Sequence, residues 1–349
     1  MTSDLQHALP LLYAGRGWKL TTLFGPEHGI WGEAQDMAHV GDARDPRTGA
    51  RVISLYGQSF ARLSPQPDEL AEIDVLLVDL QDVGARYYTF VWTALLALRA
   101  CAKVGVHVIV LDRPNPIDGV TVEGRPHAEL RLRSFVGLEP LPIRHARTLG
   151  EIVAQHAEAE GIARSLEVVR VSGWDRGTYA DAWDRPFVMP SPNMPTLDTA
   201  VVYPGGCLVE ATNLSEGRGT TRPFEIVGAP WIDPHRLADG LSDTGLSGFR
   251  ARPLTFVPTF QKHAGTPCGG VQIHVSDRRT FRPVSTYLAL LSLARAQRPD
   301  AFALRTETYE YVPPTEAEAL DLLCGTTATR RALVAGAHWS EVVASVCDV

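Results

Sequence analysis

Cysteine and long apolar runs are scarce in this sequence, and both shortages restrict its class. Its five cysteines form neither a CxxC pair nor a zinc-type pattern, so we expect buried small hydrophobic residues rather than metal ligands. No stretch approaches the roughly 18 apolar residues that span a membrane. Residues 1–10 include Asp4, Gln6 and His7, where a signal peptide would be apolar. The sequence as written predicts a cytoplasmic protein without a membrane partner, or a periplasmic or secreted one if the true start lies upstream.

Several enzyme motifs are missing as well. No GxGxxG follows the first predicted strand, no Walker Lys-Ser/Thr pair is present, and neither GxSxG nor HExxH occurs. These absences argue against nicotinamide, flavin, nucleotide, serine-hydrolase and zinc chemistry, so we expect no cofactor and no metal. Basic residues are in the minority, with 33 Lys and Arg against 40 Asp and Glu. Without a concentrated basic patch, nucleic acid is not expected as a partner.

The composition that remains is that of a globular protein. The chain has 349 residues, 45% of them hydrophobic, which predicts two domains. From residue 18 to 173, apolar β-rich runs alternate with amphipathic stretches, the pattern of parallel βα units. We count about five strands, at 19–24, 52–56, 75–80, 107–111 and 166–171. Helices are predicted at 90–104, 148–160 and, later, 285–296.

This pattern predicts an α/β fold with a doubly wound parallel sheet. Five strands favour an open sheet over a TIM barrel, which needs eight. The alternation ends near the proline-rich segment 189–195, beyond which short strand-like runs such as 269–275 mix with helices. We therefore place one domain at 1–195 and a second, smaller α+β domain at 196–349.

Ligands of open parallel sheets bind beyond the carboxyl ends of the strands, so the residues that follow each predicted strand are candidates. Glu27 and His28 follow the first strand. The loops after the third and fourth strands carry most of the remaining polar side chains, namely Asp82, Arg86, Tyr87, Tyr88, Asp112, Arg113 and Asn115. Three successive loops thus predict one polar edge.

Each of these residues also has a structural interpretation. Glu27 and His28 are compatible with a solvated turn, Asp82 with a helix cap and Arg86 with a surface ion pair. One of the two tyrosines is expected to be a core ring, since neighbours in a loop rarely both face a ligand. Two prolines make segment 112–116 compatible with a rigid turn.

A second concentration of polar residues spans 210–224. Gly217 and Gly219 let the backbone approach a ligand closely, and Arg218 and Arg222 are suited to hold an anion or carboxylate. A salt-bridged structural loop is the alternative. His263, close to Gly265 and Cys268 in the chain, is a further and weaker candidate.

Six longer segments resemble one known family. They are Leu23–Gly29, Asp79–Phe90, Leu111–Pro116, Ser191–Thr196, Ala211–Phe224 and Pro258–Gly265. Together they are similar to the exo-β-N-acetylmuramidases, glycoside hydrolase family 171, formerly a domain of unknown function. The match runs from about residue 18 to about residue 335.

The resemblance implies a bacterial glycosidase of cell-wall recycling with a Rossmann-like domain, an auxiliary domain and a cleft between them. Its substrate would be a peptidoglycan-derived muropeptide or disaccharide, from whose non-reducing end it releases N-acetylmuramic acid. The resemblance makes Glu27 the catalytic carboxylate and Tyr87 or Tyr88 its partner. Asp82, Glu216 or the substrate's own acetamido group are alternatives for the second group.

Other residues are expected to contact substrate. These are His28, Asp82, Arg86, Asn115, Asn213, Glu216, Arg218, Arg222 and His263. N-acetylmuramic acid carries a lactyl carboxylate, which would explain arginines that converge on one pocket.

The chain is shorter at both ends than the family it resembles. The missing first strand would lie near the middle of the sheet, so we expect a stability cost and a start upstream of Met1. A non-catalytic muropeptide- or sugar-binding protein with the same fold is the rival interpretation. A sugar oxidoreductase is disfavoured by the missing glycine motif. The sequence does not define the oligomeric state.

Overall fold

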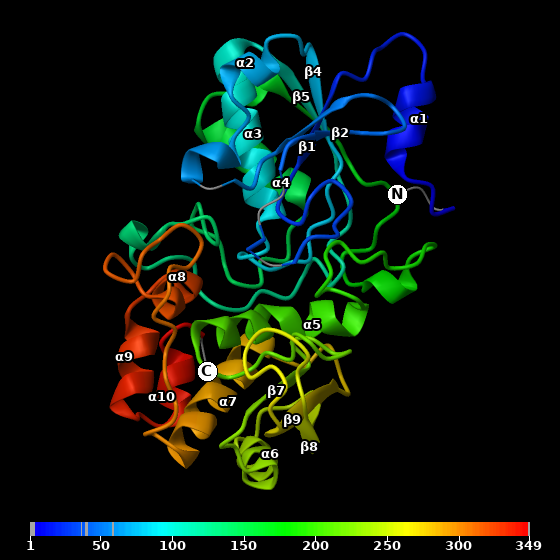
Figure 1. Ribbon diagram of the computed structural model, residues 1–349. Coiled ribbons are helices and arrows are strands. Elements are labelled where there is room, and N and C mark those ends of the chain that lie inside the picture. The colour runs from blue at the N-terminus through cyan, green and yellow to red at the C-terminus, as the bar shows by residue number, and fades with distance from the viewer. Residues whose placement is uncertain (1–3, 36, 39–40, 58, 348–349) are drawn as a thin grey trace. The chain divides into compact units, whose positions relative to one another are not determined.

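The computed structural model describes residues 4–35, 37–38, 41–57 and 59–347, which form two compact units (Figure 1). Unit 1 takes the described residues of Met1–Val83, Tyr88–Val120 and Arg147–Pro195. Unit 2 takes those of Gly84–Tyr87, Thr121–Ala146 and Thr196–Val349. Residues 84–87 and 121–146, which the sequence analysis assigned to the first domain, therefore belong to unit 2.

Unit 1 contains two three-stranded sheets. In the first, β1 (Thr22–Gly25) pairs in parallel with β3 (Arg51–Ser54), and β2 (Ala43–Arg44) pairs antiparallel with β3. In the second, β4 (Val75–Val78), β5 (His107–Leu111) and β6 (Leu166–Val169) are parallel, with β5 in the middle. All five predicted strands are present, but they do not form one continuous sheet.

The described residues of unit 1 form four α-helices: α1 (Ala8–Ala14), α2 (Pro67–Leu70), α3 (Phe90–Val104) and α4 (Leu149–Ala159). Helix α3 packs against β5, and its first nine residues are all buried because nearly all of them are apolar. It ends at Gly105, whose positive φ of 82° suits glycine. Helix α4 begins with a capping box between Thr148 and Glu151. Both helices have the bounds predicted from the sequence to within one residue.

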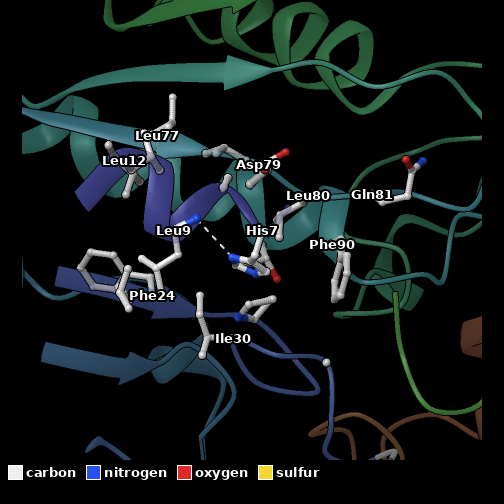
Figure 2. Close-up of a pocket in the computed structure, with 18 of the residues that line it drawn as sticks. His7, Leu9, Leu12, Phe24, Ile30, Leu77, Asp79, Leu80, Gln81 and Phe90 are labelled. Atoms are coloured by element: carbon white, nitrogen blue, oxygen red, sulfur yellow. Dashed lines mark hydrogen bonds between the residues drawn. The ribbon is translucent and has the colours of Figure 1, made fainter. Parts of the chain in front are cut away.

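An apolar cavity of about 710 Å³ borders both sheets of unit 1 (Figure 2). Its walls come from α1, β1, β4 and α3. Figure 2 shows Leu9 and Leu12 of α1 near Phe24 of β1 and Leu77 of β4. The cavity is thus lined by residues of both β1 and β4, which belong to separate sheets.

Unit 2 is built around an antiparallel sheet with the strand order β7-β9-β8. These strands are β7 (Ile226–Ala229), β8 (Phe249–Phe256) and β9 (Cys268–Val275). The helices are α5 (Leu197–Gly206), α6 (Pro234–Asp243), α7 (Pro283–Gln297), α8 (Ala319–Cys324), α9 (Ala328–Ala335) and α10 (Trp339–Ala344). Helices α5 and α7 lie side by side (Figure 1). A Cβ on Gly205 would lie 2.0 Å from the Pro283 carbonyl oxygen, so only glycine permits this packing.

Short 3₁₀ helices connect these elements, at η1 (Phe60–Leu63), η2 (Leu130–Leu132), η3 (Ala163–Ser165), η4 (Ala180–Ala182) and η5 (Cys207–Ala211). All five cysteines are buried thiols, as the sequence predicts. Among the described residues, no helix combines the length and the apolar character needed to cross a membrane.

Candidate active site

Glu27 lies in the turn that follows β1. The Leu55 amide donates to the Gly25 carbonyl over 2.7 Å, which holds the ends of β1 and β3 together. His28 and Gly29 have positive φ values of 71° and 81°, and they reverse the chain directly after Glu27. The His28 ring contacts the Ala34 carbonyl through Nδ1 at 2.9 Å, which ties down the far side of the turn. Glu27 is consequently held in place with only 5% of its surface exposed.

The hydroxyl of Thr89 donates to Glu27 Oε2 over 2.8 Å. Tyr88, the preceding residue, packs edge-on against Phe90 with ring centroids 4.9 Å apart. Burial raises the pKa of Tyr88 far above its usual value; a hydrogen bond with Ser191 opposes the rise, while the Glu27 and Asp82 carboxylates add to it. Unit 1 therefore brings Glu27 and Asp82 within electrostatic reach of Tyr88.

The two neighbouring tyrosines have different environments. Tyr87 belongs to unit 2, where its hydroxyl donates to the Pro204 carbonyl and its ring packs edge-on against Tyr203. Tyr88 belongs to unit 1, together with Glu27. The expectation that one of the pair is a core ring is met by Tyr87, which leaves Tyr88 as the tyrosine beside the carboxylate.

Arg86 is completely buried in unit 2. Its guanidinium donates to the carbonyls of Leu141 (2.7 Å), Leu323 (2.5 Å) and Arg125 (3.1 Å). Burial lowers its pKa to about 10. The alternative of a surface ion pair is wrong for Arg86, because the side chain has no exposed surface and its partners are backbone oxygens.

The loop after β5 is a turn held by side-chain hydrogen bonds. Asp112 accepts hydrogen bonds from the Thr148 hydroxyl (2.6 Å) and the Gly150 amide (2.8 Å) at the start of α4. Asn115 donates to the Arg147 carbonyl over 3.0 Å and accepts from the Ile117 amide over 3.1 Å. These contacts favour the rigid-turn interpretation of segment 112–116. Arg113 forms an ion pair with Asp79. Asp82, in the loop that follows β4, is buried.

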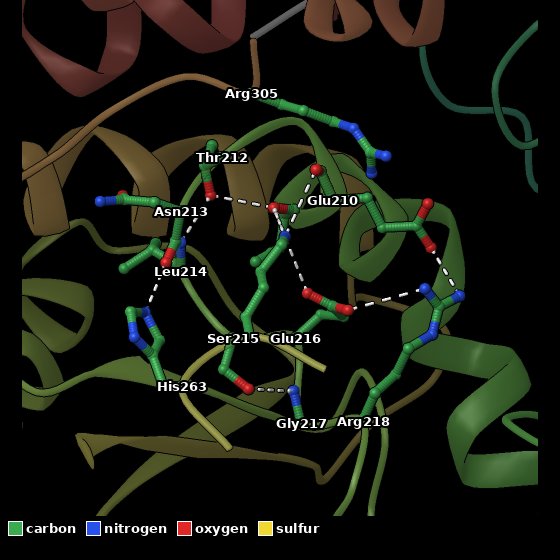
Figure 3. Close-up of polar contacts among 12 residues, drawn as sticks. Glu210, Thr212, Asn213, Leu214, Ser215, Glu216, Gly217, Arg218, His263 and Arg305 are labelled. Carbon is green, nitrogen blue, oxygen red and sulfur yellow. Dashed lines mark hydrogen bonds and ion pairs between the residues drawn. The ribbon is translucent and has the colours of Figure 1, made fainter. Parts of the chain in front are cut away.

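Unit 2 contains a second, charged cluster (Figure 3). Arg218 contacts Glu210 at 2.9 Å and Glu216 at 3.6 Å, and Lys262 contacts Glu216 at 3.0 Å. Burial works to raise the pKa of Glu216, but the charges of Lys262 and Arg218 outweigh it and hold the pKa below its usual value. The Tyr309 hydroxyl donates to Glu210 over 2.8 Å. The cluster therefore pairs two carboxylates with two cations.

The other predicted residues of unit 2 lie around this cluster. The Asn213 side chain bonds the backbone of residues 301 and 303, and its carbonyl contacts His263 Nε2 at 2.7 Å. Arg222 lies 3.5 Å from Glu225 and has 43% of its side chain exposed. Asn213 and His263 thus brace the loop, whereas Arg222 has surface available to a ligand.

Two residues at these sites, and a third at a neighbouring strand end, were not selected from the sequence. Thr89 and Lys262 lie inside family-like segments, but nothing in a local pattern shows that their side chains reach Glu27 and Glu216. Tyr56 lies two residues beyond β3, at the same strand end as Glu27, and is buried. Parallel pairing of β1 with β3 was the signal that would have indicated it. Within the described part of the chain, no group of three or more His, Cys, Asp or Glu side chains is arranged to hold a metal ion.

An α/β unit that holds a buried carboxylate and a phenol beyond its parallel strands has the groups that glycoside hydrolases use. Family models specify the class further. The N-terminal model of exo-beta-N-acetylmuramidase NamZ matches residues 1–198, and the C-terminal model matches residues 201–348. The chain belongs to the exo-β-N-acetylmuramidase NamZ family, and it is a glycosidase with both parts of that family's fold.

Individual relatives agree with this assignment. The peptidoglycan beta-N-acetylmuramidase NamZ of Bacillus subtilis (strain 168) is 43% identical over 302 residues, covering 86% of this chain and 72% of the relative. Two crystal structures of DUF1343 family proteins from Bacteroides fragilis NCTC 9343 are also similar. One has a TM-score of 0.86 at 29% identity, covering 99% of this chain and 87% of its own. The other has a TM-score of 0.70 at 26% identity, covering 99% and 86%. The predicted family and the two-part α/β fold are confirmed.

Proposed function

We propose that this chain releases terminal N-acetylmuramic acid from the non-reducing end of peptidoglycan fragments, with Glu27 as the general acid. The observation that carries the assignment is the placement of Glu27 beyond β1, buried and hydrogen-bonded by Thr89, with Tyr88 beside it. Burial of a carboxyl group favours its protonated form, which an acid catalyst needs.

In this mechanism Glu27 donates its proton to the glycosidic oxygen as the bond to the muramic acid C1 breaks. Positive charge develops at C1 and is quenched by water, the substrate acetamido group or an enzyme nucleophile. The raised pKa of Tyr88 keeps its phenol protonated at neutral pH, which favours a hydrogen-bonding role over direct attack. Asp82, close enough to influence Tyr88, is the carboxylate available as a base in the same unit.

Glu216 is less suited to the acid role. Lys262 and Arg218 hold it ionised, and an ionised carboxylate has no proton to give. We therefore assign Glu216 to the architecture of the 210–224 loop.

The lactyl carboxylate of the substrate requires a cation. Arg218 already faces two carboxylates, and Arg86 is used by backbone carbonyls. Arg222 has the most exposed guanidinium-bearing side chain of these three predicted arginines and only a 3.5 Å contact to Glu225. Among these three arginines, Arg222 is therefore the one whose side chain is available to bind a carboxylate.

The test of the function compares hydrolysis of 4-nitrophenyl β-N-acetylmuramide with that of the matching glucosaminide. The wild-type chain should hydrolyse the muramide far faster, and Glu27→Gln should lose about 10²–10⁴-fold in kcat. Glu69→Gln is a matched control, because Glu69 is also a buried glutamate of unit 1 but bonds Arg62 and the Gln66 amide. Equal rates on both glycosides, or cleavage inside long glycan chains, would contradict the proposal. Tight binding of the muramide without turnover would instead support the non-catalytic binding protein.

A further inference from the structure

Thr89 occupies the position that precedes helix α3, where serine or threonine normally caps the helix with its side chain. Here the side chain makes no capping bond. Its hydroxyl instead donates to Glu27 Oε2 over 2.8 Å, across 62 positions of sequence. The hydroxyl therefore bonds the candidate acid and does not cap the helix.

The backbone of Thr89 is anchored at the same time. Its carbonyl accepts from the Trp92 amide at 3.0 Å, from the Thr93 amide at 2.9 Å and from the Thr93 hydroxyl at 3.2 Å. Helix α3 is buried over its first nine residues, so this anchor has little freedom to move. A β-branched side chain adds a restricted χ1 angle. The Thr89 hydroxyl is consequently a fixed point to which one oxygen of Glu27 is attached.

The contact between Thr89 and Glu27 favours one protonation state of the Glu27 carboxyl group. A hydrogen bond donated to a carboxylate favours its ionised form, and the positive end of the α3 dipole does the same. Tyr88, from the loop that leads into α3, interacts electrostatically with both Glu27 and Asp82, and His28 is the next residue in the turn after Glu27. Burial opposes ionisation of a carboxyl group, so the Thr89 hydroxyl acts against the effect of burial.

We propose that Thr89 is the positioning residue of the Glu27 carboxyl group, fixing its orientation through Oε2 and favouring its ionised form. This inference rests on the proposed function only in taking Glu27 as the acid. Thr89 itself need not touch the reacting atoms. Its effect on turnover would come from the orientation of Glu27 and from the pH at which Glu27 loses its proton.

The experiment uses three variants of the full chain. Thr89→Val keeps the shape and removes the hydroxyl, Thr89→Ser restores it, and Thr329→Val is the matched control. Thr329 is also a buried helical threonine, but it lies in α9 of unit 2, where its hydroxyl contacts the Ser345 hydroxyl at 2.7 Å. The two readouts are the ¹³C NMR titration of the Glu27 carboxyl carbon, identified by its loss in Glu27→Gln, and the pH profile of muramide kcat/KM.

Thr89→Val should move the titration midpoint of Glu27, and the alkaline limb of the profile, upward by about one to two pH units, the shift that a charge-assisted hydrogen bond produces. Thr89→Ser should return both toward wild type, and Thr329→Val should leave both in place. An unchanged Glu27 midpoint in Thr89→Val would overturn the inference. A shifted midpoint with an unshifted activity profile would uphold the link between Thr89 and Glu27 and contradict the catalytic role of Glu27.

Discussion

Glu27 in unit 1 and Glu216 in unit 2 are both buried glutamates of family-like loops, yet their partners differ in kind. Glu27 is bonded by a neutral hydroxyl beside a tyrosine and an aspartate, whereas Glu216 lies between a lysine and an arginine. Neutral donors leave a carboxyl group able to exchange its proton, while two cations keep it charged. The comparison teaches that burial alone does not identify an acid catalyst; the charge of the neighbours decides.

The largest expected effect on folding concerns Glu216. Glu216→Gln removes the carboxylate that faces Lys262, and breaking a buried ion pair from one side costs about 3–5 kcal/mol. In the wild-type protein, the stability that Glu216 contributes should also be lost in acid. Because folding lowers the pKa of Glu216, this contribution is present above the pKa of the unfolded chain and disappears as the pH falls through the pKa of the folded protein. Urea unfolding of Glu216→Gln beside Glu27→Gln measures the difference. A larger loss of stability in Glu27→Gln would reverse the two roles.

Acid should also act on unit 2 through a different residue, His127. Burial lowers its pKa to about 3, with Arg86 and Arg133 adding to the shift, and neither ring nitrogen has a hydrogen-bond partner among the described residues. The unfolded chain binds a proton below about pH 6.5 and the folded chain does not, so stability should fall as pH drops from 6.5 toward 3.

The lowered pKa of His127 changes the free energy of unfolding by up to several kcal/mol, because each pKa unit corresponds to about 1.4 kcal/mol. Between pH 6.5 and 4.5 the effect of His127 on stability is separated from that of Glu216, because the usual pKa of a glutamate is 4.5. His127→Leu should flatten the stability profile in that window, and the exposed His235→Leu should not. A slope in His127→Leu as steep as that of the wild type would rule His127 out as a source.

The adjacent tyrosines offer the smallest and most selective test. Tyr87→Phe leaves the buried Pro204 carbonyl without its donor, which should cost about 1–3 kcal/mol of stability and leave kcat unchanged. Tyr88→Phe should reduce kcat on the muramide, because the phenol beside Glu27 is lost. Thermal unfolding and turnover of both variants provide the measurement. Should Tyr87→Phe reduce kcat more than Tyr88→Phe, the catalytic partner would be Tyr87.

Much of unit 1 could be predicted from the sequence, because its strands are short apolar runs and α3 ends at a glycine. The assignment of these strands to two separate sheets does not follow from local patterns, because strand pairing depends on contacts between residues far apart in the sequence. The residues of the candidate site also differ in how far they could be predicted from the sequence. Glu27 follows from its place after a strand, whereas the opposite environments of Tyr87 and Tyr88 depend on the chain passing from one unit to the other between them.

The cavity between the two sheets of unit 1 has a consequence for amide hydrogen exchange. Strand β5 is hydrogen-bonded to β4 on one side and β6 on the other, whereas β1 and β4 each have one paired side among the described strands. Amides at a one-sided edge are released by smaller openings of the structure than those in the middle of a sheet. The turn that carries Glu27 thus extends from a strand with a low cost of local opening, so deuterium uptake should appear in β1 well before β5.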